Sequence, residues 1–372
     1  MNRLGIGLVV CNALHYWVFR NLARALAKKC SVTWIINPNQ GPKGNDADFF
    51  ESKGIRTISI ENADLENFDA LVMVSPDAAL FSAKKPVFVR AIYGFAKEKW
   101  SLSPVNCWYD LILCPGKYAK ERLSNRTLCE VVGNPKFDGY SRLNPGPKRR
   151  KKTILYLPSH AEASSITTFS KSIDALAGKY EVIVKLHHGL PKECKGLFGR
   201  RVRVLDERDD LLPLLKRADV VLSDYSGAVY DALLVKKPVM LLDLPEEQLE
   251  KSLVLKGSMM TRLHAILPHT NRPEDVENLI REILASKKLG RIEGNVYRHL
   301  FFTPKNASGL AADAIIRLIK ERTNRKHQLR KHGERLAAKA LNALIRRNGN
   351  PLVRKLVKAI INRSVTLPPE RS

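Results

Sequence analysis

The sequence lacks a long apolar segment, a targeting segment and an excess of acidic residues. No run approaches the ~18–20 consecutive apolar residues that cross a bilayer. The chain begins MNRLGIGLVVCNALHYW, and its short apolar stretch before Cys11 has neither the length nor the small-residue cleavage site of a signal peptide. This stretch indicates a buried strand, and we expect the protein in the cytosol.

The cysteines form no C-x-x-C pair, and most of them stand among apolar residues. In a chain of 372 residues this usage is typical of small buried side chains, and it argues against a disulfide framework or a structural zinc site. The six positions are Cys11, Cys30, Cys107, Cys114, Cys129 and Cys194.

Acidic residues are scarce beside basic ones, with 37 Asp+Glu against 63 Lys+Arg and a net charge of +26. A hydrophobic content of 44% and a charged content of 27% exclude wholesale disorder, and the length suggests about two domains. The basic excess is concentrated in residues 320–372, which indicates a polyanionic partner such as anionic lipid or nucleic acid.

The first part of the chain alternates short apolar runs with helical spacing. This order predicts a parallel sheet with crossover helices. The expected strands are Leu4–Cys11, Ser31–Ile36, Arg56–Ile60, Ala70–Val74, Val87–Ala91 and Leu111–Cys114, with a helix at Phe19–Lys29.

A second series of alternating elements follows the sequence LNPGPKRRKK at Leu143–Lys152, which is typical of a solvated linker. Its expected strands are Thr153–Leu157, Glu181–Leu186, Val202–Leu205, Val220–Ser223 and Pro238–Leu242. Its expected helices are Ser165–Leu176, Asp209–Arg217, Gly227–Val235, Pro273–Ser286 and Ser308–Lys320.

Two Rossmann-like halves joined by a linker describe the α/β architecture called GT-B, in which ligands bind in the cleft beyond the carboxyl ends of the strands. We predict an N-terminal domain over residues 1–147, a second domain over 148–319 and a basic helical tail over 320–372.

The tail is predicted to form two amphipathic helices. Residues 334–347 place leucines and alanines on one face, and Asn350-Pro351 starts a second helix with one apolar and one basic side. Residues 334–363 are therefore expected to contact the anionic cytoplasmic membrane surface. The alternative is a helix that packs on the protein body and leaves its charged face in water.

Asp219–Leu242 is the most informative segment, because a buried strand ends at Asp224-Tyr225-Ser226-Gly227 and a helix follows at once. Free N–H groups at a helix start favour an anion. Ser226 can add a hydroxyl, and Gly227 lets a phosphate approach the backbone. Equally, Ser226 can simply cap the helix.

Three more strand ends carry candidate side chains that would face the cleft. Lys185 and His187 are predicted to share one face of their strand, with His188 on the other. A histidine there can donate to a diphosphate or protonate a leaving group. The remaining candidates are Ser159 and His160 after the first strand of the second half, which can instead cap a helix, and Tyr93, Gly94 and Lys97 in the first half.

The order of segments resembles that of the CDP-glycerol glycerophosphotransferase family, whose members build teichoic acids and similar glycerol-phosphate capsular polymers. The segments are VFVRAIYGFAKEKW, YDLILCPGKYAKERL, VVGNPKFD, TILYLPSH, VIVKLHH and DVVLSDYSGAVYDALLVKKPVMLLD, and the whole match runs from roughly Val87 to Leu318. The D-Y-S-G segment followed by a K-P strand is the most specific, and Gly133-Asn134-Pro135-x-x-Asp138 is the next.

The resemblance implies roles for individual residues. His187 matches the histidine of the family's K-x-H-P segment, which contacts the donor diphosphate, and His188 replaces the proline. Ser226 and Gly227 match a phosphate-binding Ser-Ser pair. Tyr93 stands where many members have a histidine regarded as the base, and a phenol with a pKa near ~10 is a poor base at neutral pH. Either Tyr93 positions the acceptor while a group such as His15 takes the proton, or the chemistry has changed.

The expected reaction is attack of an acceptor hydroxyl on the β-phosphate of CDP-glycerol, with release of CMP. The acceptor is expected to be a polyprenyl-linked saccharide or growing polymer. No acidic cluster stands out as a metal site, since Asp206–Asp210 reads better as a helix start, so we expect no required metal or cofactor. The alternatives are a GT-B glycosyltransferase using a nucleotide sugar, with Asp231 on the donor ribose, and a catalytically decayed member acting as a scaffold. A nucleic-acid binder is disfavoured because no known nucleic-acid motif appears.

Overall fold

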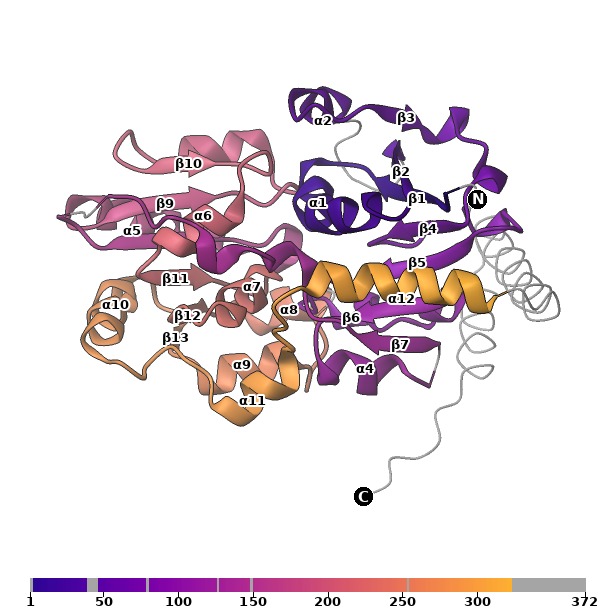
Figure 1. The fold of residues 1–372 in the computed structure, drawn as a ribbon. Coiled ribbons are helices and arrows are strands. Elements are labelled where there is room, and N and C mark those ends of the chain that lie inside the picture. Colours follow the sequence, from indigo (N-terminus) through magenta and orange to yellow (C-terminus); the bar gives the residue numbers. More distant parts are fainter. Residues whose placement is uncertain are drawn as a thin grey trace, which may run out of the picture.

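The computed structural model describes residues 3–38, 46–77, 80–125, 127–147, 150–252 and 254–322. Two parallel sheets with helices on their faces stand side by side (Figure 1). The α/β, GT-B-type architecture expected from the alternating sequence is confirmed. The predicted tail helices and the membrane contact of residues 334–363 lie outside the described residues.

The first sheet has seven strands in the order β3-β2-β1-β4-β5-β6-β7, and every pairing is parallel. The strands are β1 Gly5–Val10, β2 Ser31–Ile36, β3 Thr57–Ser59, β4 Ala70–Met73, β5 Val87–Ala91, β6 Leu111–Cys114 and β7 Leu128–Val131. The helices of this half are α1 Ala13–Ala27, α2 Ala47–Ser52, α3 Glu98–Ser101 and α4 Lys117–Leu123.

The second sheet has six strands in the order β10-β9-β8-β11-β12-β13, again all parallel. The strands are β8 Thr153–Leu157, β9 Glu181–Lys185, β10 Arg203–Leu205, β11 Val220–Ser223, β12 Val239–Leu242 and β13 His269–Thr270. The helices are α5 Ile166–Ala175, α6 Leu211–Arg217, α7 Ala228–Leu234, α8 Glu246–Lys251, α9 Met259–Ile266, α10 Val276–Ala285 and α11 Gly294–Leu300.

Helix α12, Ala307–Glu321, returns from the second half and packs on the first, against α1, β5 and β6 (Figure 1). Its first turn is fixed by Asp138, whose carboxylate accepts from the N–H groups of Ala307 and Ser308 at 3.0 and 2.7 Å. The chain thus crosses between the halves twice. The domain limits at 147 and 319 remain predictions.

The apolar runs read from the sequence become strands buried on both faces. β4, β11 and β12 are buried at every residue, as a parallel sheet covered by crossover helices requires. The core also continues between the halves, where the rings of Phe95 and Tyr230 lie 5.9 Å apart. This shared core fixes the strand ends of the two sheets opposite one another.

The prediction that the first helix begins at Phe19 is wrong, because α1 begins at Ala13. Asn12 is the N-cap, and its side-chain oxygen accepts from the N–H of His15. The prediction failed because the polar residues Asn12 and His15 interrupt the apolar spacing at the start of the helix. The first turns of α1 follow β1 and place side chains on the side that faces the second half.

All six cysteines are free, and four of them are buried, as the sequence predicted. None of the helices in the described ranges has the length and apolarity to cross a membrane.

Candidate functional site

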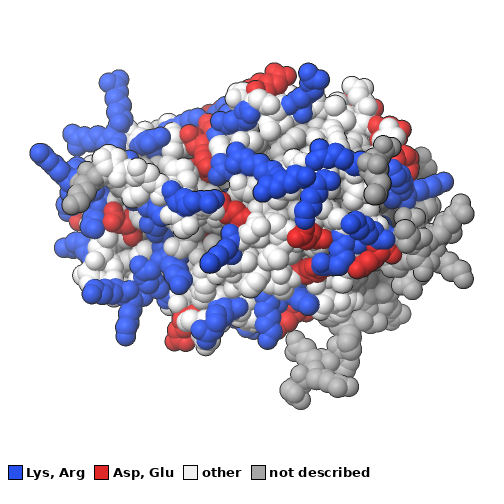
Figure 2. All heavy atoms as spheres, viewed as in Figure 1, with Lys and Arg blue, Asp and Glu red and all other residues white. Residues whose placement is uncertain are grey.

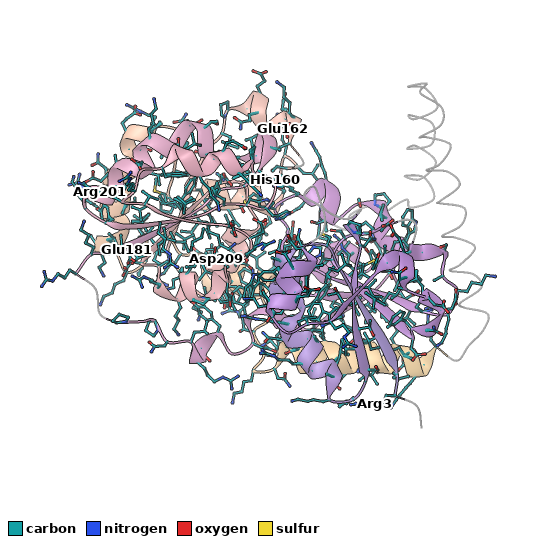
Figure 3. All side chains as sticks on the ribbon, turned by 90° about the horizontal axis from the view of Figure 1, so that it is seen from above. Arg3, His160, Glu162, Glu181, Arg201 and Asp209 are labelled. Atoms are coloured by element: carbon teal, nitrogen blue, oxygen red, sulfur yellow. The ribbon has the colours of Figure 1, made fainter. Side chains whose placement is uncertain are left out.

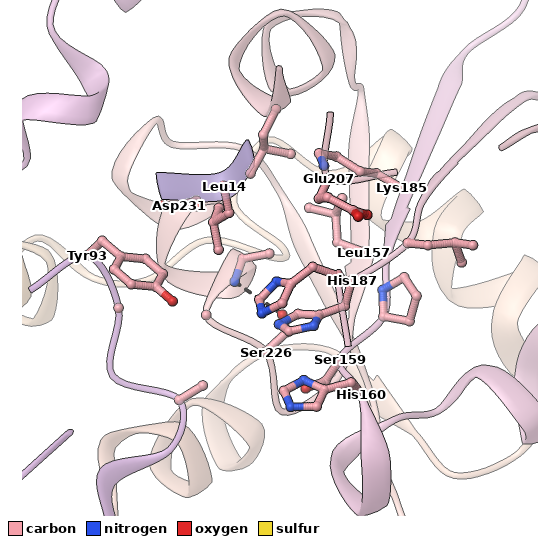
Figure 4. A pocket seen from close by; sticks show the side chains of 18 of the residues that line it. Leu14, Tyr93, Leu157, Ser159, His160, Lys185, His187, Glu207, Ser226 and Asp231 are labelled. Atoms are coloured by element: carbon pink, nitrogen blue, oxygen red, sulfur yellow. Dashed lines mark hydrogen bonds between the residues drawn. The ribbon is translucent and has the colours of Figure 1, made fainter. Parts of the chain in front are cut away.

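One pocket of about 240 Å3 lies between the two halves (Figure 4). Its wall comes from residues that follow the carboxyl ends of strands in both sheets, where open α/β sheets bind ligands. Figure 3 shows His160 and Asp209 on the side of the second half that faces the first, whereas Glu181 and Arg201 lie at its far end.

The structure brings most of the predicted site residues onto this one wall. Two predicted residues, His15 and Asp224, are not part of it. The predicted residues on the wall are Tyr93, Gly94, Lys97, Ser159, His160, Lys185, His187, Ser226 and Gly227.

Three histidine rings form a stack in the pocket. The centroids of His160 and His187 are 4.0 Å apart, and those of His187 and His188 are also 4.0 Å apart. The prediction that His188 points away from His187 is wrong, because β9 ends at Lys185 and the alternation of a strand does not extend to residues 187 and 188. His188 also lines the pocket.

Gly189 makes the stack possible. A Cβ at this position would lie 2.8 Å from ring carbons of His160, which is too close for any side chain. The N–H of Gly189 also donates to Nδ1 of His187 at 3.0 Å. The neutral His187 ring therefore carries its proton on Nε2, which makes that atom a hydrogen-bond donor.

The histidines are neutral at pH 7. Burial lowers the pKa of His160 to about 4 and that of His188 to about 3. Burial, reinforced by His188 and His160, also holds the pKa of His187 well below its ordinary value of 6.5. The stack therefore presents neutral donors and acceptors rather than fixed positive charge.

Lysines supply the positive charge of the site. Lys97 comes from the loop after β5 and places its Nζ 2.8 Å from Nε2 of His160, so it joins the two halves. Lys185 at the end of β9 donates to the backbone oxygen of Asp206 at 2.6 Å. Burial lowers the pKa of both lysines to about 8, and each remains mostly protonated at pH 7.

The D-Y-S-G segment lies where β11 meets α7, against the first half. Ser226 is buried, and its Oγ accepts weakly from the N–H of Ala228 at 3.3 Å. A Cβ on Gly94 would lie 3.5 Å from Cα of Gly227, so the two glycine backbones meet across the joint. A Cβ on Gly227 itself would meet nothing within 4 Å.

Asp224 lies beneath the pocket rather than on its wall. Its carboxylate accepts from the N–H groups of Ser159 and Ser165 and from the Ser165 hydroxyl, each with a contact of 2.8 Å. Burial raises the pKa of Asp224 to about 7, while these hydrogen bonds act in the opposite direction. The arrangement makes Asp224 a support for the loop that carries His160.

His15 lies behind the wall, in the first turn of α1. It is only 4% exposed, and its Nδ1 accepts from the N–H of Cys11 at 3.2 Å. Burial lowers its pKa to about 4. Its neighbours Leu14 and Trp17 face the pocket instead.

Tyr93 does line the pocket, and its phenol stays protonated at neutral pH. Burial, with contributions from Asp231 and Cys11, raises the pKa of Tyr93 to about 12. The group is therefore a hydrogen-bond donor here and a poor base.

Sequence reasoning missed an ion pair in the pocket. Nζ of Lys136 lies 2.5 Å from Oδ2 of Asp231, and Lys136 is only 2% exposed. The pair links the Gly133–Asp138 segment, which the sequence did single out, to α7 of the second half. Asp231, which the nucleotide-sugar interpretation assigned to the donor ribose, is thus already paired with Lys136.

Two further carboxylates, Glu207 and Asp209, also line the pocket. The acidic run that contains them does start a helix as predicted, since Asp210 caps α6. In the structure this acidic run contacts the first half, where the backbone oxygen of Glu207 accepts from Nε1 of Trp17. This contact could not be read from the sequence. In the described residues, no group of three or more His, Cys, Asp or Glu side chains could hold a metal ion.

The family described as CDP-Glycerol:Poly(glycerophosphate) glycerophosphotransferase matches residues 132–290. This range contains the histidine stack, Lys136, Lys185 and the D-Y-S-G segment. None of the curated proteins matches the sequence.

Solved structures share the fold at low sequence identity. The wall teichoic acid polymerase TagF is 15% identical with a TM-score of 0.57, over 86% of this chain and 90% of that chain. A TagF variant soaked with CDPG is 14% identical with a TM-score of 0.58, over 86% and 89%. MnaA of S. aureus with UDP is 14% identical with a TM-score of 0.58, over 85% and 96%.

Proposed function

We propose that the chain is a transferase of the CDP-glycerol glycerophosphotransferase type, the family matched by residues 132–290. It would transfer glycerol phosphate, or a related polyol phosphate, from a CDP-activated donor to a hydroxyl of a membrane-linked saccharide or polymer. The observation that carries the proposal is the neutral histidine stack beside Lys97 and Lys185 in the pocket between the halves.

The donor diphosphate would lie against the stack. Nε2 of His187 offers a hydrogen bond whose direction Gly189 fixes, and Lys97 and Lys185 bring positive charge to the same wall. These groups are held in place by the fold before any ligand binds, and preorganised donors stabilise developing charge most effectively.

The transfer forms one P–O bond and breaks another. The acceptor oxygen bonds to the β-phosphorus of the CDP-polyol, the bond from that phosphorus to the bridging oxygen breaks, and CMP leaves with the bonding electrons. The second pKa of a phosphate monoester is about 6, so CMP leaves as an anion that needs charge stabilisation more than a proton. His187 as a neutral donor and the two lysines fit this task.

The acceptor would approach from the first half, past Tyr93 and Gly94. With its pKa raised to about 12, Tyr93 donates a hydrogen bond that positions the acceptor hydroxyl. The proton acceptors on the pocket wall are the neutral imidazoles of His160 and His188 and the carboxylates of Asp231, Glu207 and Asp209. His15, behind the wall, is the less direct choice for the base.

We place the reaction at the cytoplasmic face of the cell membrane, in the synthesis of a cell-surface or capsular polymer. The net charge of +26 suits a surface of anionic lipid, and residues 334–363 are the predicted contact. A polyprenyl-linked acceptor would be available there. The proposal requires neither a metal nor a further cofactor.

The test is release of CMP by the purified full chain from CDP-glycerol and CDP-ribitol, beside UDP- and GDP-sugars, with membranes of the source cell as acceptor. Acceptor-dependent CMP from a CDP-polyol is the expected result and also identifies the polyol. Turnover of a sugar nucleotide alone would instead make the chain a glycosyltransferase. CDP binding without turnover of any donor would favour a non-catalytic scaffold.

A further inference from the structure

Three hollows outside the pocket join into one groove across the two halves. Their volumes are about 410, 310 and 390 Å3. The first two share Lys236 and Tyr297, and the last two share Asp138, Gly139 and Lys305. We call these three adjoining hollows the basic groove. It has no lining residue in common with the pocket.

The lining of the basic groove is strongly cationic. Among the described residues that line the groove, Asp138 alone is acidic, and its carboxylate accepts from the N–H groups of Ala307 and Ser308 and from the Ser308 hydroxyl at the start of α12. The basic residues of the lining are Arg24, Lys28, Arg142, Lys236, Lys237, Arg291, Arg298 and Lys305.

Most of these cations have no carboxylate partner. Some exposed lysines elsewhere on the surface are paired, as in Lys179–Glu277 and Lys256–Glu246, so what distinguishes the groove is that its unpaired cations lie together in three adjoining hollows. Within the described part of the chain, no ion pair is formed by six exposed members of the groove, Arg24, Lys28, Arg142, Lys236, Arg298 and Lys305. Figure 2 shows more Lys and Arg than Asp and Glu on one face of the molecule. Clustered cations without partners are a binding surface for a polyanion.

Lys236 holds a backbone conformation that favours glycine. Its φ is +59°, directly after α7, where the left-handed conformation is disfavoured for a residue with a side chain. The side chain places Nζ 5.2 Å from the ring centre of Tyr297, inside the groove. Glycine would adopt this backbone conformation at a lower steric cost, yet the residue here is a lysine whose charge lies in the groove.

We propose that the basic groove binds a linear phosphodiester polymer, the poly(polyol phosphate) chain that acts as acceptor and product, so this inference rests on the proposed function. A free phosphate would fill one hollow only, whereas the cations are spread along all three. A flat membrane surface would not follow a recessed path. Asn134 and Phe137 line the groove, whereas Lys136 between them lines the pocket. Only this short stretch of chain would therefore separate a polymer in the groove from the pocket.

The test compares two variants of the full chain that remove equal charge. The first carries Lys236→Gln, Arg298→Gln and Lys305→Gln. The matched control carries Lys192→Gln, Arg200→Gln and Arg201→Gln, which are exposed residues outside the groove. Binding of purified poly(glycerol phosphate) of one defined length is measured by calorimetry, without any CDP donor, at several salt concentrations.

The groove variant should bind the polymer at least about tenfold more weakly, and the slope of log K against log salt should fall by about 2 for three lost phosphate contacts. The control should bind like the unaltered chain. Equal losses in both variants would overturn the proposal, because only the overall charge would then matter.

Two further arms identify the occupant. If the groove variant lost binding to phosphatidylglycerol vesicles while keeping the polymer, the groove would be a membrane contact and the proposal would fail. It would also fail if single-stranded DNA of equal charge competed with the polymer on equal terms. Transfer of the polyol phosphate to a single-unit acceptor, with release of CMP, is measured separately. Turnover without polymer binding rejects the groove alone, and polymer binding without turnover rejects the reaction alone.

Discussion

His187 has the most closely defined surroundings of any side chain in the pocket. The N–H of Gly189 directs its proton to Nε2, and burial keeps the ring neutral. Replacing it with alanine removes one preorganised donor, so we expect His187→Ala to lower kcat/KM for the CDP-polyol by about 10²–10³-fold. His187→Gln, which restores an N–H donor, should recover part of the loss. The measurement is CMP release under subsaturating donor.

His269 provides the matched control for this substitution. It is half exposed, bonds to Asp243 at 2.5 Å and lies outside the pocket. His269→Ala should turn over like the unaltered chain, and circular dichroism should show all three variants folded. Near-normal turnover by folded His187→Ala would remove this histidine from the mechanism.

At the scale of elements, the loop from β8 to α5 depends on the carboxylate that ends β11. Asp224 accepts from two backbone N–H groups and one hydroxyl of that loop. In Asp224→Asn an NH₂ group replaces one of the two accepting oxygens, so at least one buried donor of the loop would face another donor and lose its acceptor. We expect a loss of about 2–3 kcal/mol in the free energy of unfolding, measured by urea titration, together with a fall in activity through His160.

Asp219 tests whether this effect belongs to the loop. It precedes the same strand and accepts from the N–H of Thr153 at 2.8 Å, but at the end away from the pocket. Asp219→Asn should lose less stability and keep its activity. If Asp224→Asn were as stable and as active as the unaltered chain, Asp224 would have no supporting role.

The elements also show what could be read from the sequence. Buried strands such as Ala70–Met73 and Val220–Ser223 were predicted almost to the residue, because a continuous apolar run bounded by polar residues has few other uses in a parallel sheet. β7 was missed, since its four residues include an exposed leucine and a glutamate. Most of the site residues predicted from strand ends lie on the pocket wall, because the topology alone brings these strand ends together.

The rest of the site depends on contacts between distant parts of the chain. Lys136 and Asp231 are 95 positions apart, and no local pattern marks them as partners. The direction of His188 failed for a related reason, since the strand ends two residues earlier than its alternation needs. Glu207 and Asp209 were read correctly as part of a helix start, yet their place on the wall follows from how the halves meet.

At the scale of the whole molecule, the buried histidines make stability depend on pH. His15, His160, His187 and His188 have pKa values lowered by burial, whereas in the unfolded chain they titrate near ~6.5. Below that pH the unfolded state binds more protons than the folded state. Stability is therefore constant with respect to these groups above about pH 7.5 and falls as the pH drops from ~6.5 toward 4.

Asp224 acts in the opposite direction, because its pKa is raised to about 7 and the folded state holds the extra proton between that value and its unfolded ~3.9. Burial also raises the pKa of Asp231 and lowers that of His264, so the histidines with lowered pKa values outnumber the carboxyls with raised ones and decide the sign. We expect the urea midpoint to fall steadily between pH 7 and pH 5. His188→Gln should reduce the slope of the unfolding free energy against pH by up to about 1.36 kcal/mol per pH unit, which is the contribution of one proton.

The window from pH 7 to pH 5 separates this effect from general acid unfolding, because ordinary carboxylates begin to titrate near ~4. A midpoint that stays level down to pH 5 would mean that these rings take up protons in the folded chain as readily as in the unfolded chain. Below pH ~6.5, His187 would then meet the donor diphosphate as a cation, and its Nδ1 could no longer accept from Gly189.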